Sequence, residues 1–417
     1  MVNEARKGKR NYVFWLGLAL CTLYQSYRYP LQISNAGTSH TYSDTPPILQ
    51  AGKFALAFPL IAISAVRWLS NSARASRWLI IFGTVFLSSF SLLKILSGHD
   101  SQYIDVSFWI LFSLILALSV DTISVSAVDK YFCIVLAYAF ASTLVQIFLF
   151  MVFGRLPALA SEGTYLVRFG GFLDDPNGFA AIWFLLMGWS YKRFQGRTRF
   201  LILAGIVVSL LLTQSWTAIG FFLVILFVYA VIGAFKRPLS ALLAIGALPL
   251  FAIFLVRLIS ILQQGFLLEI LEAKQASIGE HVFPWTFWAA KWTDWVLLGS
   301  WEYNAYESWW GAALVNFGVL WFAGYLVLVV ALLMYLRRAS AKAARESKPV
   351  YAGLLLFGYY FAFGSLNLPL PIIFPINVLF FLFFFLVAFG KIGADTHGTV
   401  ASSKLPLAQA LAEATGE

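Results

Sequence analysis

Charged side chains are scarce in this chain. Only 12% of its 417 residues are Asp, Glu, Lys or Arg, whereas 60% are hydrophobic, and the mean hydropathy is +0.80. A soluble domain carries about 25% charged and about 45–50% apolar residues. The scarcity of charge therefore excludes a soluble globular protein. It indicates an integral membrane protein, in which lipid replaces most of the apolar core that a soluble fold must build.

Cysteine and histidine are also sparse, with two and four copies respectively. Cys21 and Cys133 both lie inside apolar runs, so the chain offers neither a disulfide framework nor a paired-cysteine metal site. The four histidines lack the short spacing of metal ligands. We therefore expect no metal and no cofactor.

Long apolar runs are abundant, and we interpret them as spans that cross about 30 Å of hydrocarbon. Each run should be helical, because lipid cannot satisfy free backbone groups. The predicted spans are 12–27, 49–66, 78–96, 104–124, 131–153, 178–191, 200–214, 216–234, 239–260, 309–336, 350–366 and 372–390. The sequence thus predicts an all-α, polytopic integral membrane protein with about twelve transmembrane helices. Eleven or thirteen spans remain alternatives, because the runs 200–214 and 216–234 nearly merge.

The distribution of positive charge sets the orientation of these spans. With the N-terminus inside, 21 of the 29 Lys and Arg residues lie on the cytoplasmic side and 8 lie outside or near outer ends. The acidic residues divide the other way, with 7 inside and 12 outside. The net charge of +10 therefore follows the positive-inside rule and does not indicate nucleic-acid binding. Both termini are expected to be cytoplasmic.

The spans form a single transmembrane domain over 1–392, followed by a polar, mobile cytoplasmic tail at 393–417. Three outward segments exceed plain connectors, at 28–48, 154–177 and 261–308. The last is rich in aromatic residues, which argues against disorder, and a loop of its length is usually functional. We expect it to contain helices at 262–278 and 283–298 that lie on or near the outer membrane surface.

The first motif that indicates chemistry opens the span at Gly178. Pro176 and Asn177 favour a helix start, and the preceding Gly170 and Gly171 let the backbone turn closely. Arg168 is then held just outside the membrane beside a helix N-terminus. An arginine fork at such a place suits a phosphate or a pyrophosphate. The alternative is a capped helix start with a snorkelling arginine.

The second motif lies where the largest outer loop re-enters the membrane. Glu307 stands two residues before Trp309, which opens the next predicted span. A carboxylate there is partly desolvated, which suits a general base. The alternative is an interfacial polar residue beside an aromatic belt that Trp309 and Trp310 would form.

Together these residues resemble the O-antigen ligase and O-antigen polymerase superfamily of bacterial inner membranes. Members show an outer-loop arginine, a glycine and a Pro-Asn helix start, which stand here at Arg168, Gly170 and Pro176-Asn177. A Thr/Ser-rich turn follows one helical hairpin later, here at 213–216. The motifs of the large outer loop stand at His281, Trp285, Gly299, Glu307-Ser308 and Gly318. The resemblance covers roughly 165–325 at the level of single residues.

Three positions depart from the family pattern. Trp216 and His281 stand where the family has arginines, and Glu307 stands where it has a histidine. Ligases of the family rely on that histidine, so its replacement favours the polymerases.

The resemblance implies a metal-independent glycosyltransferase of the bacterial inner (cytoplasmic) membrane, with its active site and a large helical loop facing the periplasm. It would polymerise an O-antigen, exopolysaccharide or capsule by moving a glycan from an undecaprenyl-diphosphate donor to a sugar hydroxyl of another lipid-linked repeat unit. The expected partners are the undecaprenyl-diphosphate-linked oligosaccharide, the lipid bilayer and a chain-length regulator protein, with no nucleic acid.

The implied site combines three catalytic residues with a set of substrate-binding ones. Arg168 would bind the diphosphate, His281 would add a second cation, and Glu307 would be the general base. The expected substrate-binding residues are Asp174, Asp175, Asn177, Lys291 and Ser308. For the two aspartates, capping of the next helix is an equal alternative, and a salt bridge between His281 and Glu307 is an alternative for that pair.

Other functions remain in view. A ligase of the same superfamily would share the fold and the chemistry and differ in its acceptor. A polysaccharide transporter or flippase would place charges deep within spans or break helices at mid-membrane. Lys53 and Lys94 lie near span ends and Asp121 lies near an inner end, so mid-span charge is scarce. This pattern favours chemistry on the outer loops over transport or a scaffolding role.

Overall fold

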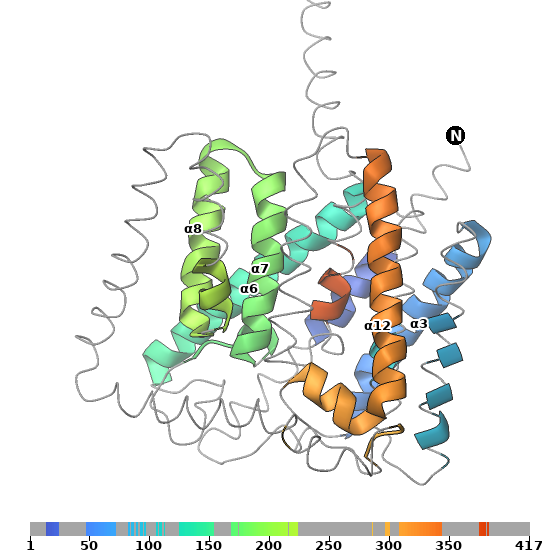
Figure 1. The fold of residues 1–417 in the computed structure, drawn as a ribbon. Helices are drawn as coiled ribbons and strands as arrows, with labels where there is room; N and C mark the ends of the chain where they lie inside the picture. Colours follow the sequence, from blue (N-terminus) through green and yellow to red (C-terminus); the bar gives the residue numbers. More distant parts are fainter. Residues whose placement is uncertain are drawn as a thin grey trace, which may run out of the picture.

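We analysed a computed structural model of the chain (Figure 1). It describes residues 14–24, 47–71, 125–153, 168–173, 175–215, 217–223, 297–300, 308–343 and 375–380, with short pieces between 82 and 112 and positions 286 and 382. Within these residues every regular element is a helix and no strand occurs. The all-α class is thereby confirmed for the described part of the chain.

Three of the described helices are long and apolar enough to cross a membrane, at Val128–Val152, Gly196–Thr213 and Trp309–Leu328. They make the described part compatible with a membrane protein. The total of about twelve spans stays a prediction. Most of the outer loop 261–308 and the whole tail 393–417 lie outside the described residues.

The long helices lie on the apolar runs that the sequence marks. They are α3 (Pro47–Asn71), α6 (Val125–Phe153), α7 (Pro176–Arg193), α8 (Gly196–Thr213) and α12 (Trp309–Ala343). Most of them continue past the ends of the predicted spans, because a helix ends at its capping residues and not where its hydrophobicity falls. In α12 the long helix bends at Gly318, and its first turns lie across the end of the remainder (Figure 1).

The helix α7 lies in the interior of a group that includes α6 and α8. Figure 1 shows α7 and α8 side by side, with α6 crossing them obliquely. Residues 179–186 of α7 are all buried, as are Trp189 and Ser190. A helix buried on all its faces lies inside a bundle. On α6 and α8, by contrast, large apolar side chains such as Phe148 and Phe200 are exposed, as expected of faces turned toward lipid.

Aromatic contacts join α6 to α7 and to the short 3₁₀ helix η4 (Gly171–Leu173). The ring centroids of Phe140 and Trp183 are 4.9 Å apart, and those of Tyr138 and Phe172 are 4.5 Å apart. Close packing of this kind drives helix association in lipid, where the hydrophobic effect between helices is absent. It fixes the segment before α7 against two helices.

A tight turn separates α8 from the helix at 217–223. Gln214 is the C-cap of α8 in the left-handed conformation, with φ 50° and ψ 31°, and its N–H donates to the carbonyl of Leu211. The carbonyl of Ser215 then accepts from the N–H of Ile219 at 2.9 Å. The nearly merging runs 200–214 and 216–234 are thus interrupted at Gln214 and Ser215.

Candidate functional site

The first part of the site is the N-terminus of α7. The helix begins at Pro176, as the Pro-Asn pair predicts, and Asp175 is its N-cap. The Asp175 carboxylate accepts the backbone N–H of Asn177 at 2.9 Å and that of Gly178 at 3.1 Å. Two of the donors that the helix start was expected to offer a phosphate are therefore already bonded to a carboxylate. These two N–H groups are therefore not available to an anion.

Arg168 is half-buried and lies between the start of α7 and the end of α8. Its Nε donates to the carbonyl of Thr213 at 3.3 Å, and its Nη2 donates to Oδ1 of Asn177 at 2.9 Å. The Thr213 carbonyl belongs to the last turn of α8, where helix carbonyls lack an intrahelical partner and favour a cation. The structure thus brings the motifs 168–177 and 213–216 together at one guanidinium.

The backbone that carries Arg168 is bonded to helices on two sides. The N–H of Phe169 donates to the carbonyl of Leu212 at 3.2 Å. On the other side, Gln146 of α6 accepts the N–H of Gly171 at 2.9 Å and donates to its carbonyl at 3.2 Å. Gly171 has φ +55°, and a Cβ there would lie 2.2 Å from the ring of Phe179. Only glycine fits this turn.

The second part of the site is a direct contact between the backbones of Gly299 and Gly318. Their φ angles are +73° and +76°, in the region that favours glycine. A Cβ on Gly299 would lie 2.6 Å from the nitrogen of Gly318, and one on Gly318 would lie 2.4 Å from the nitrogen of Gly299. Two glycines that the sequence motifs include, nineteen residues apart, therefore touch.

Residues 297–300 replace hydrogen bonds that α12 loses at its bend. The N–H of Ser300 donates to the carbonyl of Val315 at 2.6 Å, and the N–H of Leu320 donates to the carbonyl of Leu297 at 3.4 Å. In an uninterrupted helix these α12 groups would bond within the helix. Buried backbone N–H and C=O groups are nearly always bonded in folded proteins, and the segment 297–300 supplies partners for those that the bend leaves open.

Two buried polar side chains form hydrogen bonds next to this contact, one at Ser300 and one at the start of α12. Lys94, which has no exposed surface, donates from Nζ to the carbonyl of Ser300 at 2.7 Å. Ser308 is also fully buried; its carbonyl accepts from the N–H of Ala312 at 2.9 Å, and its Oγ accepts from that of Gly311 at 3.5 Å. These contacts of Ser308 are those of a helix cap, and its binding of substrate stays a prediction.

Several expected site residues lie outside the described part of the chain. They are Asp174, His281, Lys291 and Glu307. Their roles, and the arrangement of His281 with Glu307, stay predictions. Within the described residues no group of three or more His, Cys, Asp or Glu could hold a metal ion.

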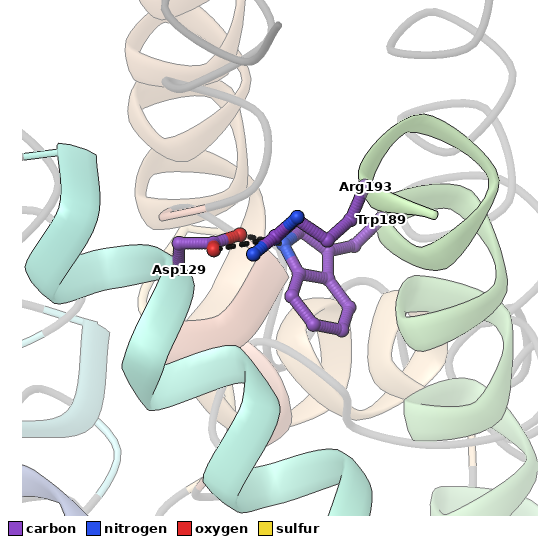
Figure 2. Close-up of polar contacts among 3 residues, drawn as sticks. All are labelled: Asp129, Trp189 and Arg193. Atoms are coloured by element: carbon purple, nitrogen blue, oxygen red, sulfur yellow. Dashed lines mark hydrogen bonds and ion pairs between the residues drawn. The ribbon is translucent and has the colours of Figure 1, made fainter. Parts of the chain in front are cut away.

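A second polar cluster joins α6 and α7 at their other ends. Figure 2 shows Asp129 of α6 pointing toward Trp189 and Arg193 of α7. Its two oxygens accept from Trp189 Nε1 at 3.2 Å and from Arg193 Nε at 2.6 Å. From Asn177 to Arg193 the helix rises about 24 Å, close to the thickness of a bilayer core. The cluster is therefore remote from Arg168.

Sequence reasoning missed Gln146. The signal that would have found it is the presence of one amide side chain in an otherwise apolar run, because a polar group in a span must be bonded inside the protein.

No protein-family model matches the chain, and a search of curated proteins returned no match. The resemblance to the O-antigen ligase and polymerase superfamily therefore depends on the residues named above.

Proposed function

We propose that the chain is a glycosyltransferase of the bacterial inner membrane that polymerises a polysaccharide from undecaprenyl-diphosphate-linked repeat units. The observation that carries the proposal is the position of Arg168. It bonds Asn177 of the first motif and Thr213 of the Thr/Ser-rich turn at 213–216, although these two motifs are far apart in the sequence. The contact of Gly299 with Gly318 gives further support, because it joins two glycines of the same motif set.

The role of Arg168 follows from its chemistry. A guanidinium presents five N–H groups in a planar fork that matches phosphate oxygens. The bonds from Nε and Nη2, to Thr213 and Asn177, fix the plane of that fork. A cation held in one orientation can stabilise the negative charge that develops on a departing diphosphate without reorganising during the reaction.

The proposed step is a substitution at the anomeric carbon of the donor sugar. A hydroxyl oxygen of the acceptor glycan forms the new glycosidic bond. The bond from the anomeric carbon to the diphosphate oxygen breaks, and the undecaprenyl diphosphate leaves with the electron pair beside Arg168. The hydroxyl proton passes to Glu307 as general base. Oxidation states do not change, so the step needs no redox cofactor.

The test compares Arg168→Ala with a matched arginine variant. Arg199 also donates from Nε to a backbone carbonyl, that of Phe194 at 2.7 Å, but lies at the other end of α8. In cells, Arg168→Ala and Glu307→Gln should lose polymer and accumulate single repeat units, with a rate loss of about 10²–10³-fold for the arginine. Arg199→Ala should elongate normally. Normal polymer in Arg168→Ala at normal membrane levels would contradict the assignment.

Transport of a polysaccharide is the second candidate function. The bend of α12 at Gly318 favours it, since transporters commonly build their sites on discontinuous helices, and the buried Lys94 is an ionisable group of the kind they use. Proteoliposomes loaded with lipid-linked repeat units separate the two functions. Polymerisation without movement of the glycan across the bilayer supports the enzyme, and movement without polymerisation supports the transporter.

A further inference from the structure

Gln146 is the only amide side chain in the apolar helix Val128–Val152. It has no exposed surface. A buried amide in such a helix is costly unless its oxygen and its nitrogen are both bonded. The described structure satisfies both with a single residue, because Gln146 accepts from the N–H of Gly171 and donates to the carbonyl of Gly171.

This pair of bonds satisfies the backbone N–H and the carbonyl of Gly171 with one side chain. Gly171 is buried, and both its N–H and its carbonyl are bonded to Gln146 of α6. Three residues before it, the guanidinium of Arg168 bonds Asn177 and Thr213. Between them, the N–H of Phe169 is bonded to α8. The segment 168–171 is therefore fixed by α8 at one end and by Gln146 at the other.

We propose that Gln146 is a positioning residue for Arg168. By holding both backbone groups of Gly171, it sets the path of the segment that presents the guanidinium at the ends of α7 and α8. The proposal rests on the function proposed above for Arg168, namely binding of the diphosphate. Gln146 does not touch the ligand in this assignment.

The expected effect of losing Gln146 is a weaker hold on the diphosphate. Removal of the amide leaves two buried backbone groups of Gly171 without their partner, so the loop leaves its position more often. The apparent affinity falls with the fraction of molecules in the binding-competent form. We expect Gln146→Met, which keeps the length of the side chain, to weaken binding by about tenfold or more. Gln146→Glu keeps an acceptor for the Gly171 N–H and should have an intermediate effect.

Asp129→Asn is the matched control. It perturbs the same two helices, because Asp129 joins α6 to α7 at the ends remote from Arg168. A loss of binding that followed only from loosened helix packing would appear in both variants. A loss that follows from the position of Arg168 would appear in Gln146→Met alone.

The experiment uses full-length protein in lipid nanodiscs and two measurements. The first is binding of undecaprenyl diphosphate, and the second is hydrogen exchange of the peptide that covers 168–173, with a peptide from 180–190 of α7 as internal reference. We expect Gln146→Met to raise exchange in 168–173 only and to weaken binding, while Asp129→Asn binds like the wild type. Wild-type binding in Gln146→Met, or unchanged exchange in 168–173, would overturn the proposal.

The two measurements also separate this proposal from the proposed function. If the wild-type protein neither binds undecaprenyl diphosphate nor elongates repeat units, the proposed function fails. Exchange in 168–173 then still decides whether Gln146 holds this segment: faster exchange in Gln146→Met supports that hold, and unchanged exchange overturns it.

Discussion

Replacement of Gly318 by alanine should destabilise the protein more than any other glycine-to-alanine change compared below. Gly318 has φ 76° and ψ 179°, a combination that is essentially confined to glycine. The new methyl group would also lie 2.4 Å from the nitrogen of Gly299 and 2.5 Å from the carbonyl oxygen of Leu297. Both neighbours are backbone atoms, so no side chain can rotate to make room.

The magnitude follows from these two effects. A non-glycine residue in this conformation costs about 1–3 kcal/mol, and forcing a methyl group into a packed site costs about 1–3 kcal/mol. Together they predict a loss of about 2–6 kcal/mol in the free energy of unfolding. The bonds that join residues 297–300 to α12 would be lost if the bend straightened.

Two other glycines separate the conformational cost of Gly318→Ala from the cost of the steric clash. Gly196 has φ +56°, but no atom lies within 4 Å of a Cβ placed there, so Gly196→Ala carries the conformational cost alone, about 1–2 kcal/mol. Gly220 has open space around its Cβ and lies inside the helix at 217–223. Gly220→Ala should therefore be neutral or stabilise by about 0.5–1 kcal/mol.

The assay is thermal unfolding of the purified variants in detergent, followed by tryptophan fluorescence. Trp321 is one of the 15 tryptophans that contribute to this signal, and it lies near the bend, with its ring stacked on Phe317 at 4.3 Å and on Tyr325 at 5.3 Å. The expected order of midpoints is Gly220→Ala highest, then Gly196→Ala, then Gly318→Ala. A Gly318→Ala midpoint at or above that of Gly220→Ala would refute the reasoning, because α12 would then be continuous through residue 318.

Two further predictions concern the ends of α7. Asp175→Ala removes the side-chain acceptor for the N–H groups of Asn177 and Gly178 and should cost about 1 kcal/mol, with Asp175→Asn costing less; equal midpoints of thermal unfolding for both variants and the wild type would contradict the cap. Asp129→Asn should cost at most about 1 kcal/mol in the same assay, because the ion pair with Arg193 is partly exposed and Asn still offers Trp189 an acceptor. A larger loss would mean that the pair is shielded from solvent.

The positions of the helices were predictable from hydrophobicity. The apolar runs at 131–153, 200–214 and 309–336 are occupied by α6, α8 and α12, because a segment in lipid must satisfy its own backbone hydrogen bonds. The start of α7 at Pro176 was predictable as well, since proline at the first position needs no donor. For Asp175 the sequence left two roles open, binding of substrate and capping of the next helix. The structure shows Asp175 as the N-cap of α7.

The site was only partly predictable. Arg168 and Asn177 were selected by their local pattern, and nothing local says that Thr213 would supply an acceptor to Arg168. The bend at Gly318 was also hidden, because hydrophobicity is continuous across it and the long apolar run reads as one helix. The role of Gln146 was not predictable from a motif, because it is a single amide in an apolar run.

By itself the sequence determined that the chain is apolar and predicted where the helices α6, α8 and α12 lie, since these follow from composition and from spacing along the chain. Tertiary structure decided which polar groups meet. Arg168 with Thr213, Gln146 with Gly171, and Gly299 with Gly318 are pairs far apart in sequence, brought together by the packing of helices against one another. Contacts of this kind depend on how helices pack across the bundle, which periodicity along one helix does not encode.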